Sequence, residues 1–330
     1  MQHHYRMRSE VEGIEEPAVG HSADLLTLGF EFDARLQRLA RAALEQMPVA
    51  VTAMAARRTG LYAALPGRGR QAVRAVSPDD DDEEPPLDDA AWARRLLSRS
   101  LAGLAWPAAP QQRFVSTDGH AAGVRALVAA AHDLAAGTVD AALVLAADSL
   151  LDEASLRWLH SRGRLKCDGA PSGVRPGEAA AALLLIRPAD AAQTPVAHTR
   201  LLGLALHDEA KPQSEGAVSS GVAMARTVAA VRQSLVQGKA WLLSDHNGEH
   251  YRANELGCAW ARLRADDPSF ADAEVWYPAL AFGDTGAACA LVGVSMATQA
   301  WQRGYAPSAA AVVACASDGP TRGALLLHHG

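Results

Sequence analysis

The 330-residue sequence has few aromatic side chains and no long uncharged apolar run. Aromatic residues make up 5% of the chain although hydrophobic residues make up 49%, so the core must come mainly from Ala, Leu and Val. These residues suit helices packed tightly on parallel strands. Without an apolar run of about 18 residues, we expect no membrane span. The polar start, "MQHHYRMRSEVEGIEEP", lacks a signal-peptide core, so we expect a flexible segment at 1–19 and a cytoplasmic protein.

Cysteine is also scarce, and its placement argues against a metal centre. The four cysteines form no Cys-x-x-Cys pair, and no spacing of cysteine and histidine fits a zinc site. We therefore expect reduced, structural cysteines, with no bound metal or cofactor. Cys315, in "ACASDG", is expected to be a buried thiol.

The net charge of −6 comes from one short segment. Residues 79–89, "DDDDEEPPLDD", hold eight acidic residues, and removing them leaves −6 + 8 = +2. A nearly neutral body argues against a nucleic-acid partner. Like charges interrupted by prolines predict a solvated loop at 78–89. A docking site for a basic partner is the alternative.

Apolar patterning predicts that strands and helices alternate along the chain. Helices are predicted at 27–47, 89–103, 119–137, 153–165, 219–238, 251–265 and 284–304. Strands are predicted at 48–55, 61–66, 111–117, 140–148, 177–188, 196–209, 240–249, 274–280, 308–317 and 323–330. This alternation indicates an α/β protein with parallel or mixed sheets.

Two segments repeat one another. Gly119 begins "GHAAGVRALV" and Gly283 begins "GDTGAACALV", each with Ala-Leu-Val seven residues after the glycine. Both predicted helices end at a glycine, Gly137 or Gly304, and lead to a strand rich in Ala and Val. We interpret the pair as a duplicated α/β unit.

Four motifs resemble segments of the thiolase-like, β-ketoacyl synthase-like superfamily. They are "GHAAGVRALVAAAHDLAAGTVDAALVLAADS", "GRLKCDGAPSGVRPGEAAAALLL", "GDTGAACALVG" and "SDGPTRGALLL". The resemblance covers about residues 20–330. It implies a thiolase-like α/β fold with pseudo-repeated halves at 20–190 and 195–330, arranged in five α-β-α-β-α layers.

The resemblance also implies where catalytic residues would lie. Ketosynthases use a cysteine at a strand-to-helix turn and two histidines that stabilise developing charge. Val115 or Ser116 takes the place of the cysteine, His246 lies near the first histidine but out of register, and Asp284 replaces the second. We therefore expect no catalytic residues. The vestigial pocket is predicted to comprise Val115, Ser116, His120, Asp245, His246, Asn247, Glu249 and Asp284.

Ser116, Asp118 and His120 could suggest a Ser/His/Asp site. Spacings of two and four residues at a helix start do not build a triad by themselves. We expect instead that Ser116, Thr117 or Asp118 caps the helix.

"HNGEH", residues 246–250, matches the His-x-x-Glu-His pattern of some zinc proteases. That pattern requires a helix, whereas Asn-Gly predicts a turn. We expect a turn in which Asp245, Asn247 and Glu249 bond to nearby backbone or to Arg252.

The leading hypothesis is an inactive thiolase-fold protein that serves as a binding, adaptor or chaperone component. Its motifs, with "D-x-NGE-x-YRA-x-E", resemble those of proteins encoded beside type VI secretion effectors, which implies a secreted effector or adaptor as partner. The fold further implies a homodimer or a heterodimer. One alternative is an acyltransferase that uses Ser116 on acyl-carrier or coenzyme A thioesters. The other is a non-catalytic partner of an active ketosynthase.

Overall fold

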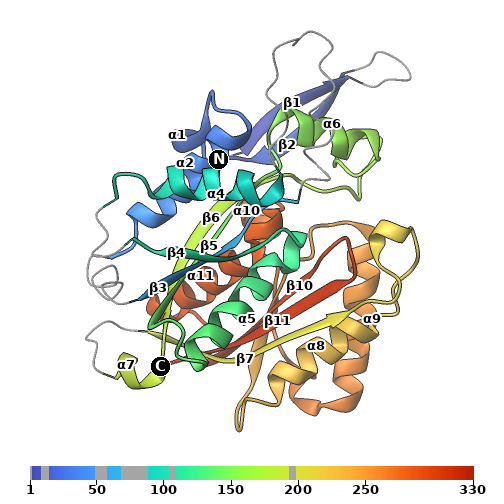
Figure 1. Ribbon diagram of the computed structural model, residues 1–330. Helices are drawn as coiled ribbons and strands as arrows, with labels where there is room; N and C mark the ends of the chain where they lie inside the picture. The colour runs from blue at the N-terminus through green and yellow to red at the C-terminus, as the bar shows by residue number, and fades with distance from the viewer. Residues whose placement is uncertain (1, 9–14, 49–57, 68–87, 105–108, 193–197) are drawn as a thin grey trace.

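A computed structural model describes residues 2–8, 15–48, 58–67, 88–104, 109–192 and 198–330 (Figure 1). Most of the predicted strand at 48–55 and of the acidic loop at 78–89 lies outside these residues. The sequence predicts a flexible segment at 1–19. In the structure, β1 (Gln2–Arg8) and β2 (Glu15–His21) pair as an antiparallel ladder. Apolar content did not predict this pairing, since the ladder is held by backbone hydrogen bonds.

The first sheet has four strands in the order β4-β3-β5-β6. Their bounds are Gln111–Ser116 for β4, Thr59–Ala64 for β3, Ala141–Ser149 for β5 and Glu178–Ile186 for β6. β3 runs parallel to β4 and β5, and β6 is antiparallel to β5. Every residue of β5 is buried, as its continuous apolar sequence predicts for a central strand.

The second sheet has five strands in the order β7-β11-β10-β8-β9. Their bounds are Thr199–Asp208 for β7, Thr321–His329 for β11, Ala310–Ala316 for β10, Ala240–Ser244 for β8 and Val275–Trp276 for β9. β8 runs parallel to β9 and β10, and β11 is antiparallel to β10. The run β9-β8-β10-β11 therefore repeats the order and strand directions of β4-β3-β5-β6.

Helices complete a five-layered α-β-α-β-α arrangement, which confirms the predicted fold class (Figure 1). The central layer contains α5 (Ala122–Ala135) and α11 (Cys289–Gln302), which share one apolar cluster with both sheets. α2 (Phe32–Glu45) and α4 (Asp89–Leu101) cover the first sheet, and α8 (Val222–Arg232) and α9 (His250–Asp266) cover the second. Asp88 caps α4 by accepting from the Ala91 N–H.

The duplication is present, but its register differs from the predicted one by three residues. A 3₁₀ turn at Gly119–Ala121 precedes α5, and the matching turn before α11 is Gly286–Ala288. Each turn begins with a glycine at positive φ, and both helices have 14 residues. Gly119 therefore corresponds to Gly286 rather than Gly283, and the shared Ala-Leu-Val spacing is a coincidence of sequence.

Three predicted boundaries are wrong. The helix predicted at 27–47 is broken after α1 (Asp24–Thr27), where Gly29 has a φ of 79°. The strand predicted at 274–280 is only β9, because Pro278 starts α10 (Ala279–Phe282). The predicted helix at 219–238 ends with α8, since the Arg232 guanidinium binds the carbonyls of Leu235 and Gly238.

Two shorter helices flank the N-terminal sheet. α6 (Glu153–Ser161) follows β5 and is capped by Asp152, whose carboxylate accepts from the Ser155 N–H at 3.0 Å. α7 (Pro188–Ala191) follows β6. None of the helices within the described ranges is both long and apolar enough to cross a membrane.

Candidate functional site

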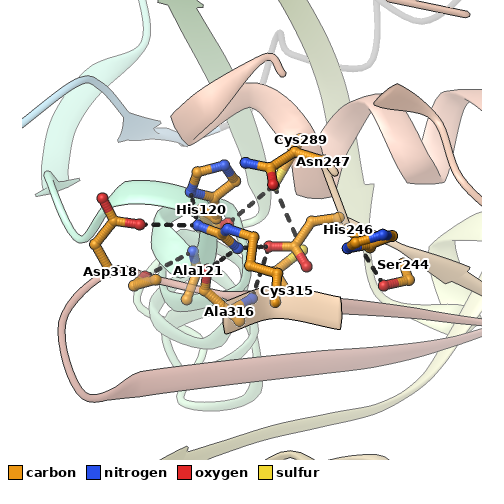
Figure 2. Close-up of polar contacts among 12 residues, drawn as sticks. His120, Ala121, Ser244, His246, Asn247, Cys289, Cys315, Ala316 and Asp318 are labelled. Carbon is orange, nitrogen blue, oxygen red and sulfur yellow. Dashed lines mark hydrogen bonds and ion pairs between the residues drawn. The ribbon is translucent and has the colours of Figure 1, made fainter. Parts of the chain in front are cut away.

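Five of the eight predicted site residues come together at the carboxyl ends of strands from both halves. Ser116 ends β4, and His120 lies in the 3₁₀ turn before α5. Residues 245–249 connect β8 to α9, and Asp284 precedes the turn before α11. Parallel strands present their following loops at one edge, so residues far apart in sequence meet there. Figure 2 shows His120, Asn247 and Asp318 converging on this point.

A buried arginine, Arg252 of α9, occupies the centre of the site. Its side chain is 2% exposed. Nη1 donates to Asp245 Oδ2 at 2.9 Å and to the Ala316 carbonyl, and Nη2 donates to Asp318 Oδ1 at 3.0 Å. Nε lies 3.5 Å from Glu249 Oε2. A guanidinium has five N–H donors and no acceptor, so its burial requires this ring of oxygens.

Asp284 is also buried, and both oxygens of its carboxylate have hydrogen-bond partners. Oδ1 lies 2.7 Å from His120 Nε2 and accepts from the Gly286 N–H at 2.8 Å. Oδ2 accepts from Asn247 Nδ2 at 2.6 Å. This carboxylate therefore links the two helix-start turns of the duplicated unit through His120 and Gly286.

Arg164 joins the N-terminal half to the same cluster. It lies in the loop after α6 and binds Glu249 through Nε at 2.7 Å and Nη2 at 3.0 Å. It also binds Asp318 through Nη1 at 2.7 Å. Two arginines thus face four carboxylates, those of Asp245, Glu249, Asp284 and Asp318. We call these six side chains and His120 the Arg252 cluster.

The cluster holds its carboxylates in the charged form. Burial alone would raise the pKa of Asp284, but His120, Arg252 and Asn247 lower that pKa far below its ordinary value. Arg164 and Arg252 likewise overcome burial and lower the pKa of Asp318 well below its usual range. Burial is also outweighed at Glu249, where the Arg164 hydrogen bonds and charge lower the pKa.

His120 is subject to opposing effects. Burial and the charge of Arg252 lower the pKa of His120, whereas the carboxylates of Asp284 and Asp245 raise that pKa by more. Nδ1 lies 3.0 Å from Arg252 Nη2, which can only donate. In the arrangement in which Nδ1 accepts from Arg252, Nε2–H donates to Asp284, and protonation of Nδ1 would cost the contact with Arg252.

Three predicted residues lie away from this centre. Val115 packs against the outer apolar cluster beneath α2 and α4. His246 turns its ring onto Tyr277, with the ring centroids 5.6 Å apart, and burial lowers the pKa of His246. Ser116 is buried, and its Oγ accepts from the Asp118 N–H at 3.4 Å. Within the described part of the chain, no hydrogen bond joins Ser116 Oγ to a histidine or a carboxylate.

The expected cap of the α5 turn is supplied by another loop. Ser317, after β10, accepts from the Ala121 N–H at 3.0 Å, whereas the side chain of Asp118 makes no cap hydrogen bond. The prediction of a cap from Ser116, Thr117 or Asp118 is therefore wrong. The loop after β10 crosses this turn, a contact that local sequence could not reveal. The predicted turn at 245–249 is present, and its Asp245 and Glu249 face Arg252 as expected.

Little space remains at the centre. A cavity lined by Ser244, Asp245, Asp284, Thr285, Cys289 and Cys315 has room for about one water molecule. Cys289 and Cys315 are both buried there, their sulfur atoms 3.6 Å apart. Sequence reasoning missed Arg252 as a centre, and it missed Arg164, Asp318 and this cysteine pair altogether.

Comparison with solved structures identifies the fold as that of ketosynthases. The chain superposes on a chain from the complex of a type II polyketide synthase acyl-carrier protein with its ketosynthase. The TM-score is 0.71 at 13% identity, over 100% of this chain and 92% of the other. For the module 6 ketosynthase of the bacillaene synthase of Bacillus subtilis the TM-score is 0.67 with 14% identity, over 89% of this chain and 59% of the other. For a ketosynthase domain of Streptomyces albus the TM-score is 0.54 with 18% identity, over 83% of this chain and 73% of the other. No protein-family model and no curated protein sequence matches.

Removing the central guanidinium tests the role of Arg252. We expect Arg252→Met to lower the free energy of unfolding by about 3–5 kcal/mol, because it leaves Asp245 and Asp284 buried without their counter-charge. Arg262→Met is the control, on an exposed face of the same helix, and should change stability by about 0.5 kcal/mol or less. Urea unfolding measures both, and an Arg252→Met variant as stable as the control would contradict the assignment.

The carboxylate pKa values predict sensitivity to acid. Asp284, Asp318 and Glu249 have lowered pKa values, so the folded state binds fewer protons than the unfolded state. Their stabilisation is complete above the ordinary carboxyl pKa, and it is lost progressively as pH falls below about 5 toward the lowered pKa values of the folded state.

Asp284→Asn should flatten this fall in the free energy of unfolding, measured by urea titration at each pH. Asp272→Asn, at a carboxylate that is 84% exposed, should leave the slope of the wild type unchanged. Equal slopes for Asp284→Asn and the wild type would show that Asp284 is not held ionised by the cluster.

Proposed function

We propose that this chain is a non-catalytic, ketosynthase-fold binding component. The observation that carries the proposal is the Arg252 cluster, which fills the place where the resemblance puts a cysteine and two histidines. His120 bonds to Asp284 and Arg252 instead of activating a nucleophile. The cavity beside it accommodates about one water molecule, so an acyl chain on a pantetheine arm has no room there.

The alternative of a relocated nucleophile finds no support in the geometry of Ser116. A serine needs an adjacent base to become nucleophilic. The Oγ of Ser116 is buried and engaged with the backbone of Asp118, whereas His120 directs both ring nitrogens at Arg252 and Asp284. The alternative of a silent partner to an active ketosynthase remains compatible with the same filled centre.

A binding role requires a surface, and the edge of the first sheet is the proposed one. β4 pairs only with β3 among the described strands, so its other edge carries free backbone donors and acceptors. Its first residues, Gln111, Gln112 and Arg113, are exposed. We propose that a second copy of the chain pairs along this edge, and that a ketosynthase-fold partner protein would use the same edge. The cargo suggested by the sequence resemblance is a type VI secretion effector or its adaptor.

Incubation with acyl-coenzyme A and acyl-carrier thioesters, followed by intact-mass measurement, tests the absence of catalysis. We expect no stable acyl adduct and no release of coenzyme A above the blank, for both the wild type and Ser116→Ala. An adduct on the wild type that is missing in Ser116→Ala would establish a relocated nucleophile and overturn the proposal. Peptide mapping separates such an adduct from chance acylation of half-buried Cys167 or Cys258.

Light scattering tests the pairing edge. We expect the wild type to have twice the chain mass, and the double variant Gln111→Lys and Gln112→Lys to be monomeric, because opposed positive charges disfavour edge pairing. The control is Gln299→Lys with Gln302→Lys, which adds the same charges at the exposed end of α11 and should remain dimeric. A monomeric wild type at about 100 µM would contradict pairing between copies.

A further inference from the structure

Two buried thiols and a carboxylate lie together beside the Arg252 cluster. Cys289 is the first residue of α11 and Cys315 lies in β10, and their side chains are 8% and 1% exposed. One carboxylate oxygen of Asp245 lies near the two sulfur atoms, and all three atoms are within 4.8 Å of one another. Figure 2 shows Cys315 beside Ala316 of β10, whereas Cys289 comes from the start of α11.

The spacing matches the geometry of a tetrahedral metal site. Zinc binds thiolate sulfur at about 2.3 Å, so two thiolates on one tetrahedral zinc lie about 3.8 Å apart. The observed separation of Cys289 and Cys315 is 3.6 Å. Two packed thiols can also lie at this distance, so the assignment depends on the carboxylate and on the adjoining cavity.

The cavity supplies room for a fourth ligand. It is lined by Asp245, Cys289 and Cys315 themselves and is large enough for about one water molecule. Three protein ligands plus one water is the ligand number of an open zinc site. Pro278 and Ala279 border the cavity on the α10 side, where Leu280 is exposed.

Outer contacts orient the carboxylate. Asp245 Oδ2 accepts from Arg252 Nη1 at 2.9 Å and from the Ala316 N–H at 2.7 Å. No hydrogen bond within the described residues takes Asp245 Oδ1. Metal-binding carboxylates are commonly held by such second contacts, which fix their direction and tune their basicity.

We propose that Cys289, Cys315 and Asp245 bind one Zn²⁺, with water as the fourth ligand. Binding forms two Zn–S bonds and releases the two thiol protons to solvent. The Cys289 thiol, which now donates to the His120 carbonyl at 3.2 Å, gives up that contact. Burial raises the pKa of the Cys289 thiol, so its proton leaves only when the metal replaces it. This site shares Asp245 with the Arg252 cluster, but it does not rest on the function proposed above.

Titration of chelator-treated, reduced protein with Co²⁺ tests the site, because cobalt takes the same tetrahedral geometry and its thiolate bonds absorb in the near ultraviolet. We expect saturation at one Co²⁺ per chain, release of about two protons per metal in weak buffer, and displacement of the spectrum by Zn²⁺. Cys289→Ala and Cys315→Ala should each lose the absorption. Cys258→Ala and Cys167→Ala are the matched controls and should keep it.

Circular dichroism establishes whether each variant is folded. Where a cysteine variant fails to fold, the Co²⁺ absorption spectrum of the wild type and the number of protons it releases test the proposal. The proposal is overturned if the folded, reduced wild type takes up neither Co²⁺ nor Zn²⁺ at equimolar metal, or if uptake releases no protons. It is also overturned if the absorption persists in Cys289→Ala. A pair that stays oxidised in a phosphine reductant, 2 Da lighter by mass, would assign these residues to a disulfide instead.

Discussion

The burial of one guanidinium, that of Arg252, determines the arrangement around it. A charge that has left water must be matched by oppositely charged groups with good hydrogen-bond geometry. Asp245, Asp318 and Glu249 supply these contacts, and each comes from a different position along two connecting loops and a helix start. Asp284 and His120 complete the set by tying the two duplicated helix-start turns together. The loops at the carboxyl edges of both sheets therefore have one mutually compatible arrangement.

The same constraint bears on function. Ketosynthase folds host their chemistry at this edge, but a fold alone does not supply an activity. A catalytic site needs side chains that are free to exchange protons and space for a substrate, and here the carboxylate of Asp284 is fully hydrogen-bonded. A buried ionic network is costly to build compared with an apolar core, so it fixes specific loop positions more than it adds stability. Fixed loop positions support the binding role proposed above, because binding requires a surface of constant shape.

The fold could be predicted from the sequence because its signals are local. The continuous apolar run of β5 and the glycine-bounded helices α5 and α11 each follow from a short window. The site was predicted only in part. Asp245, Asn247, Glu249 and Asp284 lie where their turns indicated, but the centre is Arg252, whose role depends on partners up to 132 residues away.

Other features required tertiary information. Ser116 and His120 lie only four residues apart, yet the 3₁₀ turn directs His120 into the Arg252 cluster, whereas the Ser116 hydroxyl accepts from the Asp118 backbone N–H. The pair Cys289 and Cys315 has no spacing motif, because a helix start and a strand bring the two thiols together. His246 lies near the expected position but out of register, and it packs on Tyr277, whereas Asn247 lies beside Asp284.

The proposed function depends on the Arg252 cluster filling the position where the resemblance puts a ketosynthase substrate centre. Calorimetric titration with a hydrolysis-resistant thioether analogue of acyl-coenzyme A tests this claim most directly, because it measures binding without requiring turnover. We expect no saturable heat of binding up to about millimolar ligand, a concentration at which even a weak site would bind the analogue. Saturable binding that is lost in Ala279→Trp, at the border of the cavity, would show that the centre still admits an acyl chain and would contradict the account.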